Sequence, residues 1–498
     1  MRDVRLTRLL GESAVSARPD LLGADPEVCA LTADSRAVTP GALFAALPGA
    51  HADGRAFIAD ALARGAVAVL APEGTPRPAA LDDTAAFVTD ADPRRRLSRM
   101  AATFFGTQPA FIAAVTGTNG KTSVANFCRH MWASATYRAA SLGTLGLDPA
   151  VVDSPGALTT PDPIALHRCL ADLAAAGYGR VAMEASSHGL DQGRLDGVRV
   201  AAAAFTNLTQ DHLDYHGDID AYLGAKLRLF TGLLIPEGIA VINAESAYAP
   251  RVIASAAGDR RKIWLYGETP NAALRLLARA PDPTGQTLTL DVFGQRHTVR
   301  LPLVGRFQAL NALAALGLVM AEGLPAHAAL EALADHPGIP GRLQRVATTP
   351  GGAAVFVDYA HTPDALATVL DALRPHTAGR LHVVMGCGGD RDAGKRPLMG
   401  EAATQRADRV IVTDDNPRGE DPAAIRRAIL AAAPGATEIG DRGMAIAEAV
   451  AALNPGDCLL IAGKGHETGQ IVGDTIRPFD DTTVARAAVA DRTKGGTS

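Results

Sequence analysis

The clearest chemical signature in this chain is the run TGTNGKTS at residues 116–123. It follows an apolar stretch and precedes a helix-like pattern, so the sequence predicts a strand, a glycine-rich turn and a helix start. Backbone N–H groups of such a turn face phosphate oxygens, Lys121 reaches the terminal phosphates and Thr122 offers its hydroxyl to Mg²⁺. The usual loop has a glycine where this chain has Val115, so the loop is a compressed form. The run predicts a nucleoside triphosphate site; the alternative is a tight turn with an exposed lysine.

A second candidate site follows the apolar run RVAMEA, where Glu184 precedes the sequence SSHGLDQGR. A carboxylate, two hydroxyls, His188, Gln192 and Arg194 thus emerge together from one predicted strand end. Mg²⁺ in proteins takes one or two carboxylates together with phosphate oxygens, so we expect Glu184 to bind it opposite Thr122. The alternative is that the serine and histidine only cap the next helix.

The run FTNLTQDHLDYHG at residues 205–217 again places polar side chains after a predicted strand. It contains Asn207, Asp211, His212 and Asp214. A lone histidine is more often structural than functional, but several ligand types are concentrated here. We therefore predict a functional role for His212.

A lysine lies among aromatic residues in the segment AYLGAKLRLF. Tyr222, Lys226 and Phe230 are one helical turn apart and are predicted to share one face of a helix. Partial desolvation there favours the neutral, reactive amine of Lys226. From spacing alone, however, a lysine whose stem covers apolar surface while its ammonium reaches water is the favoured reading.

The last third of the chain carries a polar motif after each of its apolar runs. These motifs are VDYAHTPDAL (357–366), GCGGDRDAGKRP (386–397), TDDNPRGEDP (413–422) and AGKGHETGQ (462–470). Asp358 is suited to accept ribose hydroxyls, and Arg391, Arg418 and Glu467 to hold a substrate that bears both amine and carboxylate groups. The alternative is that these are solvated surface loops.

Alternating apolar strands and helical patterns predict an α/β protein with parallel sheets. At 498 residues the chain exceeds one ordinary core, and we expect three domains. These are a small N-terminal α/β domain at 1–90, a central P-loop parallel-sheet ATPase domain at 91–340, and a Rossmann-like domain at 341–498. The predicted strands are, in chain order, LFAAL, AVAVLA, FIAAV, RVAMEA, AAAAFTNL, GIAVIN, AAVFVDYA, LHVVMGC, RVIVTDD and CLLIAG. An amphipathic helix, AFIADALARG, is predicted between the first two strands, and a helix is predicted after each of the last four. Ligands bind beyond the carboxyl ends of such strands, where the polar motifs lie.

Composition narrows the class of protein. A net charge of -5 without a basic run argues against nucleic acid as a partner and fits small anionic substrates. The 5 cysteines are scattered without metal-ligand spacing and predict reduced thiols in a cytoplasmic setting. Neither a signal-peptide core nor a run of about 18 apolar residues is present, so we expect no membrane span.

Together these residues resemble the Mur ligase family, ATP-dependent amide-forming enzymes of three domains, over essentially the whole chain. Within it, DNPR at 415–418 with GKGHE at 463–467 is similar to members that add meso-diaminopimelate to UDP-N-acetylmuramoyl-L-alanyl-D-glutamate in cytoplasmic peptidoglycan precursor synthesis. The resemblance implies that the D-glutamyl γ-carboxylate attacks the γ-phosphate of ATP. The diaminopimelate amine then displaces phosphate from the acyl phosphate. We expect a monomer.

The resemblance also implies site residues, in four sets. ATP would contact Gly117, Thr118, Asn119, Gly120, Lys121, Thr122, Ser123, Asn207, Asn311, Arg342 and Asp358. Mg²⁺ would be bound by Thr122 and Glu184, and a second ion by His212 and Lys226, with Lys226 carbamylated by CO₂ to N6-carboxylysine; Lys121, Lys226 and His212 would be catalytic. The UDP-substrate would contact Ser35, Ala50, His51, Ala52, Thr159, Thr160, Ser186, Gln192 and Arg194. Diaminopimelate would contact Arg391, Asp415, Asn416, Pro417, Arg418, Gly463 and Glu467.

Three positions depart from the family pattern. Ala33 replaces a larger apolar residue, Ala157 an Asn that often precedes TTP, and Gln308 the Asn of the usual GRFN, which affects uridine, muramoyl and adenine contacts. Alternative functions are the same ligation with L-lysine and a folylpolyglutamate synthetase-like ligase. A P-loop kinase or nucleotide-driven switch would leave the arginines of the last domain unexplained.

Overall fold

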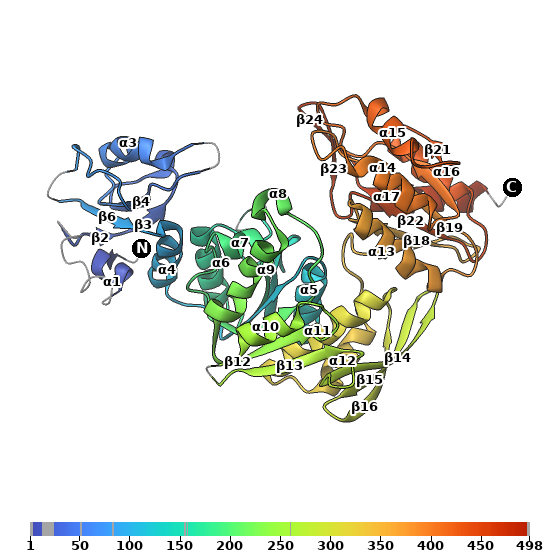
Figure 1. Ribbon diagram of the computed structural model, residues 1–498, viewed down its shortest axis with the longest axis horizontal. Coiled ribbons are helices and arrows are strands. Elements are labelled where there is room, and N and C mark those ends of the chain that lie inside the picture. Colours follow the sequence, from blue (N-terminus) through green and yellow to red (C-terminus); the bar gives the residue numbers. More distant parts are fainter. Residues whose placement is uncertain are drawn as a thin grey trace. The chain divides into compact units, whose positions relative to one another are not determined.

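The computed structural model describes residues 3–11, 24–49, 52–81, 84–153, 156, 158–258 and 260–495. The chain forms two compact units. Figure 1 shows their helices and strands, coloured along the sequence. The first comprises residues 1–272 and 314–329, and the second residues 273–313 and 330–498. The predicted domain boundaries at residues 90 and 340 stay predictions.

The N-terminal part of the first unit is a small parallel sheet with strand order β3-β4-β5-β6. The predicted strands in LFAAL and AVAVLA and the helix between them are confirmed. Apolar side chains of β4 and β5 pack into a core with the helices of this part. The elements are β1 (Val4–Arg5), α1 (Leu6–Leu10), β2 (Glu27–Val28), β3 (Ala30–Thr32), β4 (Ala42–Ala45), α3 (Ile58–Ala63), β5 (Ala68–Pro72), β6 (Ala86–Asp90) and α4 (Pro93–Phe105).

The rest of the first unit is built on a larger sheet whose strands within this unit run in the order β13-β12-β11-β7-β10-β8-β9. β8 and β9 pair antiparallel, and the pairs from β8 through β13 that carry the site are parallel. The strands are β7 (Phe111–Thr116), β8 (Ala139–Gly143), β9 (Gly146–Asp148), β10 (Arg180–Glu184), β11 (Val200–Phe205), β12 (Leu234–Asn243) and β13 (Lys262–Gly267). All four strands predicted in this region are confirmed.

Helices connect these strands and cover the sheet. They are α5 (Lys121–Ser134), α6 (Pro163–Ala175), α7 (Ser187–Asp191), α8 (Leu213–His216), α9 (Ile219–Arg228), the π-helical segment η4 (Leu229–Leu233) and α10 (Ala249–Ala256). Helix α9 ends at Arg228, so Phe230 lies in the π-helical segment and not on the predicted α-helical face with Lys226. The strands read as continuous apolar runs because helices bury both faces of a parallel sheet.

Parallel register brings the site-bearing strand ends together. Glu184 of β10 pairs with Val115 of β7, and Phe205 of β11 pairs with Thr116. The carboxyl ends of three neighbouring strands therefore lie at one edge of the sheet, where the loop at residues 116–120 begins. This is the edge at which parallel sheets bind ligands.

The second unit contains an antiparallel set and a doubly wound sheet. The antiparallel strands are β14 (Leu274–Asp282), β15 (Gly285–Val292) and β16 (Gln295–Leu301). The other sheet has the order β17-β18-β22-β19-β20-β21, with only β17 antiparallel among its described strands. Its strands are β17 (Gln344–Thr348), β18 (Ala354–Asp358), β19 (Leu381–Met385), β20 (Arg409–Val412), β21 (Thr437–Glu438) and β22 (Cys458–Ala462).

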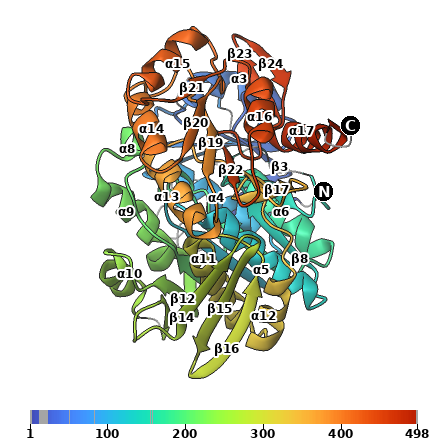
Figure 2. The same cartoon turned by 90° about the vertical axis from the view of Figure 1, so that its right-hand side faces the viewer.

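Helices cover both faces of this sheet (Figure 2). Helices α13 (Pro363–Leu373), α14 (Lys395–Thr404) and α15 (Pro422–Leu430) pack on one face, and α16 (Arg442–Ala451) and α17 (Asp481–Gly495) on the other. The predicted strands are confirmed, with one correction. β22 is followed by a hairpin, β23 (Gly469–Val472) and β24 (Thr475–Pro478), and not directly by a helix. Helices α11 (Arg306–Glu322) and α12 (Ala326–Ala334) lie between β16 and β17 in the sequence.

Candidate functional site

The loop after β7 is held in a tight, glycine-dependent form. Gly117 has a φ of +149°, and a Cβ there would lie 1.9 Å from the Thr206 hydroxyl. The Thr118 N–H donates to the Asn207 carbonyl at 2.9 Å, and the Asn119 N–H donates to the Asn207 side-chain oxygen at 2.9 Å. β11 therefore fixes the loop through Thr206 and Asn207. Asn207, predicted as a nucleotide contact, acts here on the loop backbone.

Helix α5 begins directly after this loop. Its N-cap, Gly120, is left-handed and supplies no side-chain cap, and helix N-termini can bind anions through their first backbone N–H groups. Lys121 donates to the carbonyls of Gly117 at 2.9 Å and Thr118 at 2.8 Å, which folds its ammonium back over the loop. The Thr122 and Ser123 side chains are buried at the helix start. This is the geometry of a phosphate-binding loop.

Glu184 is a buried carboxylate at the end of β10. Its two oxygens accept hydrogen bonds from the backbone N–H and the hydroxyl of Thr144, at 2.8 and 3.1 Å. Gly143 leaves room for it, since a Cβ there would lie 2.2 Å from Glu184 Oε1. Within the described residues no group of three or more His, Cys, Asp or Glu side chains is arranged to hold a metal ion. The magnesium roles of Glu184 and Thr122 stay predictions.

Lys226 is almost fully buried, with 1% of its surface exposed. Its Nζ donates to the Gly117 carbonyl at 2.9 Å and lies 4.3 Å from the centre of the Tyr222 ring. Burial, and then the neighbouring charge of Lys121, lower the pKa of Lys226 well below its ordinary value. The lysine is therefore a desolvated amine beside the phosphate loop, not a lysine that reaches solvent.

His212 lies in the left-handed region, with φ 53°, at the N-cap of α8. Its half-exposed ring is 4.9 Å from the His188 ring and 6.3 Å from the Tyr222 ring, centre to centre. Burial, followed by the nearby His212 and His216, lowers the pKa of His188. The structure thus brings the predicted residues His212 and Lys226 near the same side chain, Tyr222.

The side chains predicted to hold the central part of a UDP-substrate form one network. The Ser186 hydroxyl donates to Thr160 Oγ1 at 3.0 Å, and Thr160 Oγ1 donates to the Glu184 carbonyl at 3.0 Å. Arg194 donates to the Thr160 carbonyl at 2.7 Å and to Gln192 Oε1 at 3.0 Å. The hydroxyls of Thr159 and Thr144 are 3.2 Å apart, and this contact joins the network to the carboxylate of Glu184.

The other described residues of this set, Ser35 and Ala52, belong to the N-terminal part of the first unit. Ser35 is buried and begins a short 3-10 helix, where the Asp34 carboxylate accepts the Arg36 N–H at 2.9 Å. The hydrogen bonds from Arg36 hold the pKa of Asp34 at about 2. Ala52 is exposed. Ala50 and His51, and the departing position Ala157, lie outside the described residues.

A second cluster, in the second unit, joins the DNPR and GKGHE runs. Asn416 Nδ2 donates to Glu467 Oε2 at 2.9 Å, and the Lys464 ammonium donates to Asn416 Oδ1 at 3.1 Å and Glu467 Oε2 at 3.2 Å. Gly463 has φ +117°, and a Cβ there would lie 2.4 Å from Asp415 Oδ2. Five adjacent polar or glycine positions therefore meet at the ends of β20 and β22.

Arg418 lies beside this cluster with a strained backbone. Its φ is 50°, and hydrogen bonds to the β23–β24 hairpin hold the backbone in this conformation. The Arg418 N–H donates to the Ile471 carbonyl at 3.0 Å, and the Arg418 carbonyl accepts the Gly473 N–H at 2.7 Å. Its guanidinium donates to the Gly389 carbonyl at 2.8 Å. Arg391 is exposed, and Pro417 is buried.

The predicted nucleotide contacts of the second unit lie around β18. Asp358 is buried, which raises its pKa, and its oxygens accept N–H groups of Leu343 at 2.6 Å and Ala360 at 2.8 Å. The Arg342 guanidinium lies 5.0 Å from the Tyr359 ring centre, and among the described residues its buried Nε has no hydrogen-bond partner. Asn311 donates to Gln308 at 3.3 Å, and Gln308 donates to the Arg342 carbonyl at 3.4 Å.

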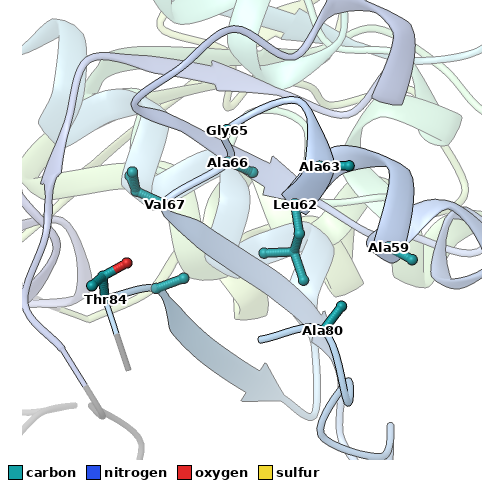
Figure 3. A pocket seen from close by; sticks show the side chains of 9 residues that line it. Ala59, Leu62, Ala63, Gly65, Ala66, Val67, Ala80 and Thr84 are labelled. Atoms are coloured by element: carbon teal, nitrogen blue, oxygen red, sulfur yellow. The ribbon is translucent and has the colours of Figure 1, made fainter. Parts of the chain in front are cut away.

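Sequence reasoning gave no role to three residues that organise these sites: Thr144, Tyr215 and Lys464. Tyr215 lies within FTNLTQDHLDYHG and Lys464 within AGKGHETGQ, so the signal for both was their position inside a polar motif. Thr144 had no such signal. The hollow beside helix α3 in the N-terminal part of the chain (Figure 3) contains none of the predicted site residues; it is lined mostly by small side chains such as Ala59, Ala63 and Ala80.

Comparison with known proteins gives matches along the whole chain. Three family models match: the Mur ligase family catalytic domain at residues 27–105, the Mur ligase middle domain at 115–319 and the Mur ligase glutamate ligase domain at 341–465. A curated protein of Caulobacter vibrioides is 53% identical, over 92% of this chain and 94% of its own length. One of Rhizobium meliloti is 50% identical, over 98% and 99%. Both are called UDP-N-acetylmuramoyl-L-alanyl-D-glutamate--2,6-diaminopimelate ligase.

Solved structures agree with the sequence matches. A structure of the same-named ligase has a TM-score of 0.74 and 34% identity and covers 99% of this chain and 100% of its own. A folylpolyglutamate synthase of Mycobacterium tuberculosis, in complex with ADP and AMPPCP, has a TM-score of 0.59 at 22% identity, covering 79% of this chain and 94% of its own, and shares the fold alone. Among the described residues, no helix is long and apolar enough to cross a membrane.

Proposed function

Because the chain belongs to the Mur ligase family, we propose that it is an ATP-dependent ligase that joins meso-diaminopimelate to UDP-N-acetylmuramoyl-L-alanyl-D-glutamate. Relatives at 50% identity and above that match almost the full chain carry that name. The observation that carries the choice of amino acid is the cluster formed by Asn416, Lys464 and Glu467 beside Arg418. It offers a carboxylate and a guanidinium to a substrate whose distal end is a zwitterion.

The reaction forms one amide bond and splits ATP into ADP and phosphate. An oxygen of the D-glutamyl γ-carboxylate attacks the γ-phosphorus, ADP leaves, and an acyl phosphate results. The neutral amine of diaminopimelate then attacks the acyl carbon, loses a proton, and inorganic phosphate leaves. Two anions meet in the first step, so cationic groups must offset their repulsion.

In this proposal the loop at residues 116–120 and the start of α5 hold the ATP phosphates. Lys121 moves from the loop carbonyls to the terminal phosphates, which its three rotatable N–H donors allow. The hydroxyl of Thr122 and the carboxylate of Glu184 are oxygen ligands of the type that Mg²⁺ prefers. Bound Mg²⁺ would supply charge neutralisation at the phosphates. Arg342, whose buried Nε has no hydrogen-bond partner among the described residues, is assigned to the nucleotide together with Asn207, Asn311 and Asp358.

We assign a carbamate to Lys226. A buried neutral amine can attack the carbon of CO₂ and release a proton, and the product bears an N-carboxylate. This changes a cation that would repel a second Mg²⁺ into an oxygen ligand, which His212 would complete. Because Lys226 lies beside both Gly117 and Tyr222, the new carboxylate would remain near the phosphate loop.

The two remaining substrate sets are assigned to the two units. The UDP-substrate contacts Ser35, Ala50, His51 and Ala52 through its nucleotide and Thr159, Thr160, Ser186, Gln192 and Arg194 through its peptide-bearing half. Diaminopimelate contacts Arg391, Asp415, Asn416, Pro417, Arg418, Gly463 and Glu467. We place the enzyme in the cytoplasm, where both ATP and the nucleotide-sugar precursor are available. We assign it a monomeric state.

Phosphate release measured with each substrate omitted in turn tests this function. We expect release only when ATP, the UDP-linked dipeptide and meso-diaminopimelate are all present, with a tripeptide product of the corresponding mass. Release with a folate and glutamate, or a product formed equally well from L-lysine, would overturn the assignment.

A further inference from the structure

A fully enclosed cation lies beneath the proposed amino-acid site. Lys464 has 0% of its surface exposed and follows Gly463 at the end of β22. A lysine costs free energy to bury unless hydrogen bonds and an opposite charge compensate it. Here the compensation comes from the two motifs that the proposed function assigns to diaminopimelate.

The first partner of Lys464 is the amide of Asn416. Asn416 Oδ1 accepts hydrogen bonds from the Lys464 ammonium at 3.1 Å and from the Ile471 N–H at 2.9 Å. Two donors facing this atom permit only an oxygen there, so the amide cannot be flipped. The NH₂ group of Asn416 must therefore face the opposite way, where it donates to Glu467 at 2.9 Å.

The second partner is Glu467 itself. Its Oε2 accepts from both Asn416 and Lys464, at 2.9 and 3.2 Å, which leaves Oε1 as the oxygen that can serve a ligand. The Glu467 side chain is 35% exposed, so its inner oxygen is anchored while the outer part reaches solvent. Asp415 places a second carboxylate beside Gly463, where a Cβ would lie 2.4 Å from Asp415 Oδ2, so the residue next to Lys464 in the sequence also borders an acidic side chain.

We propose that Lys464 is a positioning residue for the amino-acid substrate: it fixes the Asn416 amide and holds Glu467 so that an outward carboxylate oxygen faces the substrate's distal ammonium. The proposal rests on the proposed function. Lys464 contacts no substrate in this account, and it acts only through Asn416 and Glu467. Its loss should leave ATP and the UDP-substrate untouched, because neither is assigned to these residues.

The test is Lys464→Met, which keeps the length of the side chain and removes its charge and donors. We expect the KM for meso-diaminopimelate to rise at least tenfold, while the KM values for ATP and the UDP-linked dipeptide stay within twofold of wild type. Formation of ADP in a single turnover without amino acid, which reports the first step alone, should keep the wild-type rate. Lys262→Met, at the exposed start of β13, is the control for loss of one positive charge.

An unchanged KM for meso-diaminopimelate, or an equal loss in the ADP-forming step, would overturn the proposal. If Lys464→Met does not fold, Lys464→Gln carries the same test with a donor but no charge; failure of both to fold would mean that the residue is structural and the proposal wrong. A wild type that does not ligate meso-diaminopimelate would instead refute the proposed function, so the two failures are distinguishable.

Discussion

Two lysines share the carbonyl of Gly117 at the phosphate loop, and they differ in their surroundings. Lys121 bends over the loop from the first turn of α5, whereas Lys226 approaches from α9 and is buried against Tyr222. Burial, and then repulsion from the charge of Lys121, lower the pKa of Lys226. The site therefore holds Lys121 over the phosphate loop and, beside it, the buried Lys226, whose lowered pKa allows a neutral and reactive amine.

The role of Lys121 predicts a large loss of activity on truncation. Lys121→Ala removes the loop's cation aimed at the terminal phosphates, and loss of such a transition-state charge contact costs roughly 3 kcal/mol, about a hundredfold in rate. Steady-state kcat at saturating ATP is the measurement. Near-normal turnover would contradict the assignment of the loop.

The carbamate assigned to Lys226 predicts chemical rescue. Lys226→Ala should be nearly inactive and should recover part of its activity with added short carboxylic acids, which supply the missing oxygens. Intact-protein mass spectrometry at neutral pH with bicarbonate should show about 44 Da of added mass on the wild type. A fully active enzyme that carries only the bare amine would contradict this role.

At the scale of elements, short helices tie the substrate network to the His212 loop. The Tyr215 hydroxyl of α8 donates to the Asp191 carboxylate at 2.9 Å and accepts from Gln192 Nε2 at 3.1 Å. Gln192 in turn accepts from Arg194. The Tyr215 hydroxyl thus links α8 to the C-terminal end of α7.

Tyr215→Phe tests this connection, because it removes only the hydroxyl. The change removes two hydrogen bonds, each worth roughly 1 kcal/mol, so we expect the KM for the UDP-linked dipeptide to rise at least about fivefold, with little change in the KM for ATP. Tyr248→Phe, next to α10, is the matched control and should behave as wild type. Equal changes in both KM values would mean that Tyr215 supports the fold in general.

Helix α6 packs through a buried histidine whose titration opposes folding in acid. His167 is 1% exposed, and its Nε2 lies 3.1 Å from the Asp196 carbonyl. Burial lowers its pKa from 6.5 to about 4. The unfolded chain therefore takes up this proton first as pH falls, so the stability contributed by neutral His167 is intact above about pH 6.5 and is lost between there and about pH 4.

This loss amounts to roughly 2 kcal/mol of the free energy of unfolding at pH 5. Urea titrations at pH 7.5 and pH 5 measure how much free energy of unfolding is lost between the two pH values. We expect His167→Gln to lose roughly 2 kcal/mol less than the wild type over this interval. His327→Gln, at an exposed position, is the control and should keep the wild-type drop. An identical drop in the His167 variant would contradict the inferred burial of a neutral ring.

At the scale of the whole molecule, the strands and the polar residues at their ends could be predicted from the sequence, because apolar runs and polar motifs alternate regularly along it. Continuous apolar runs such as FIAAV and CLLIAG became buried strands because helices cover both faces of both sheets. Polar residues at their ends then had to meet, as Glu184 and Thr116 do through the register of β10, β7 and β11. These predictions required no knowledge of side-chain contacts.

Features without a regular pattern escaped prediction. The π-helical turn that takes Phe230 off the face of Lys226 has no periodic signature. The hairpin after β22 did have a sequence signal, because Gly473 and Asp474 stand between two runs of alternating residues. The strands before β22 are each predicted to be followed by a helix, and the same was therefore expected after β22. The burial of Lys464 could not be predicted, because charge and motif are the same for a buried and an exposed lysine.

The central claim is that Arg418 and the cluster beside it select a zwitterionic side chain. Diaminopimelate differs from L-lysine by a second carboxylate, which a guanidinium can bind in a two-point fork. A site built for a polar group can reject an analogue that lacks it by roughly 10⁴-fold, whereas an apolar pocket discriminates by only about 10- to 200-fold.

The most direct measurement is kcat/KM for meso-diaminopimelate and for L-lysine, in the wild type and in Arg418→Ala. We predict a strong preference for diaminopimelate in the wild type, and in the variant a much larger loss for diaminopimelate than for lysine, so that the ratio narrows. A wild type that prefers lysine, or a ratio that Arg418→Ala leaves unchanged, would contradict the account.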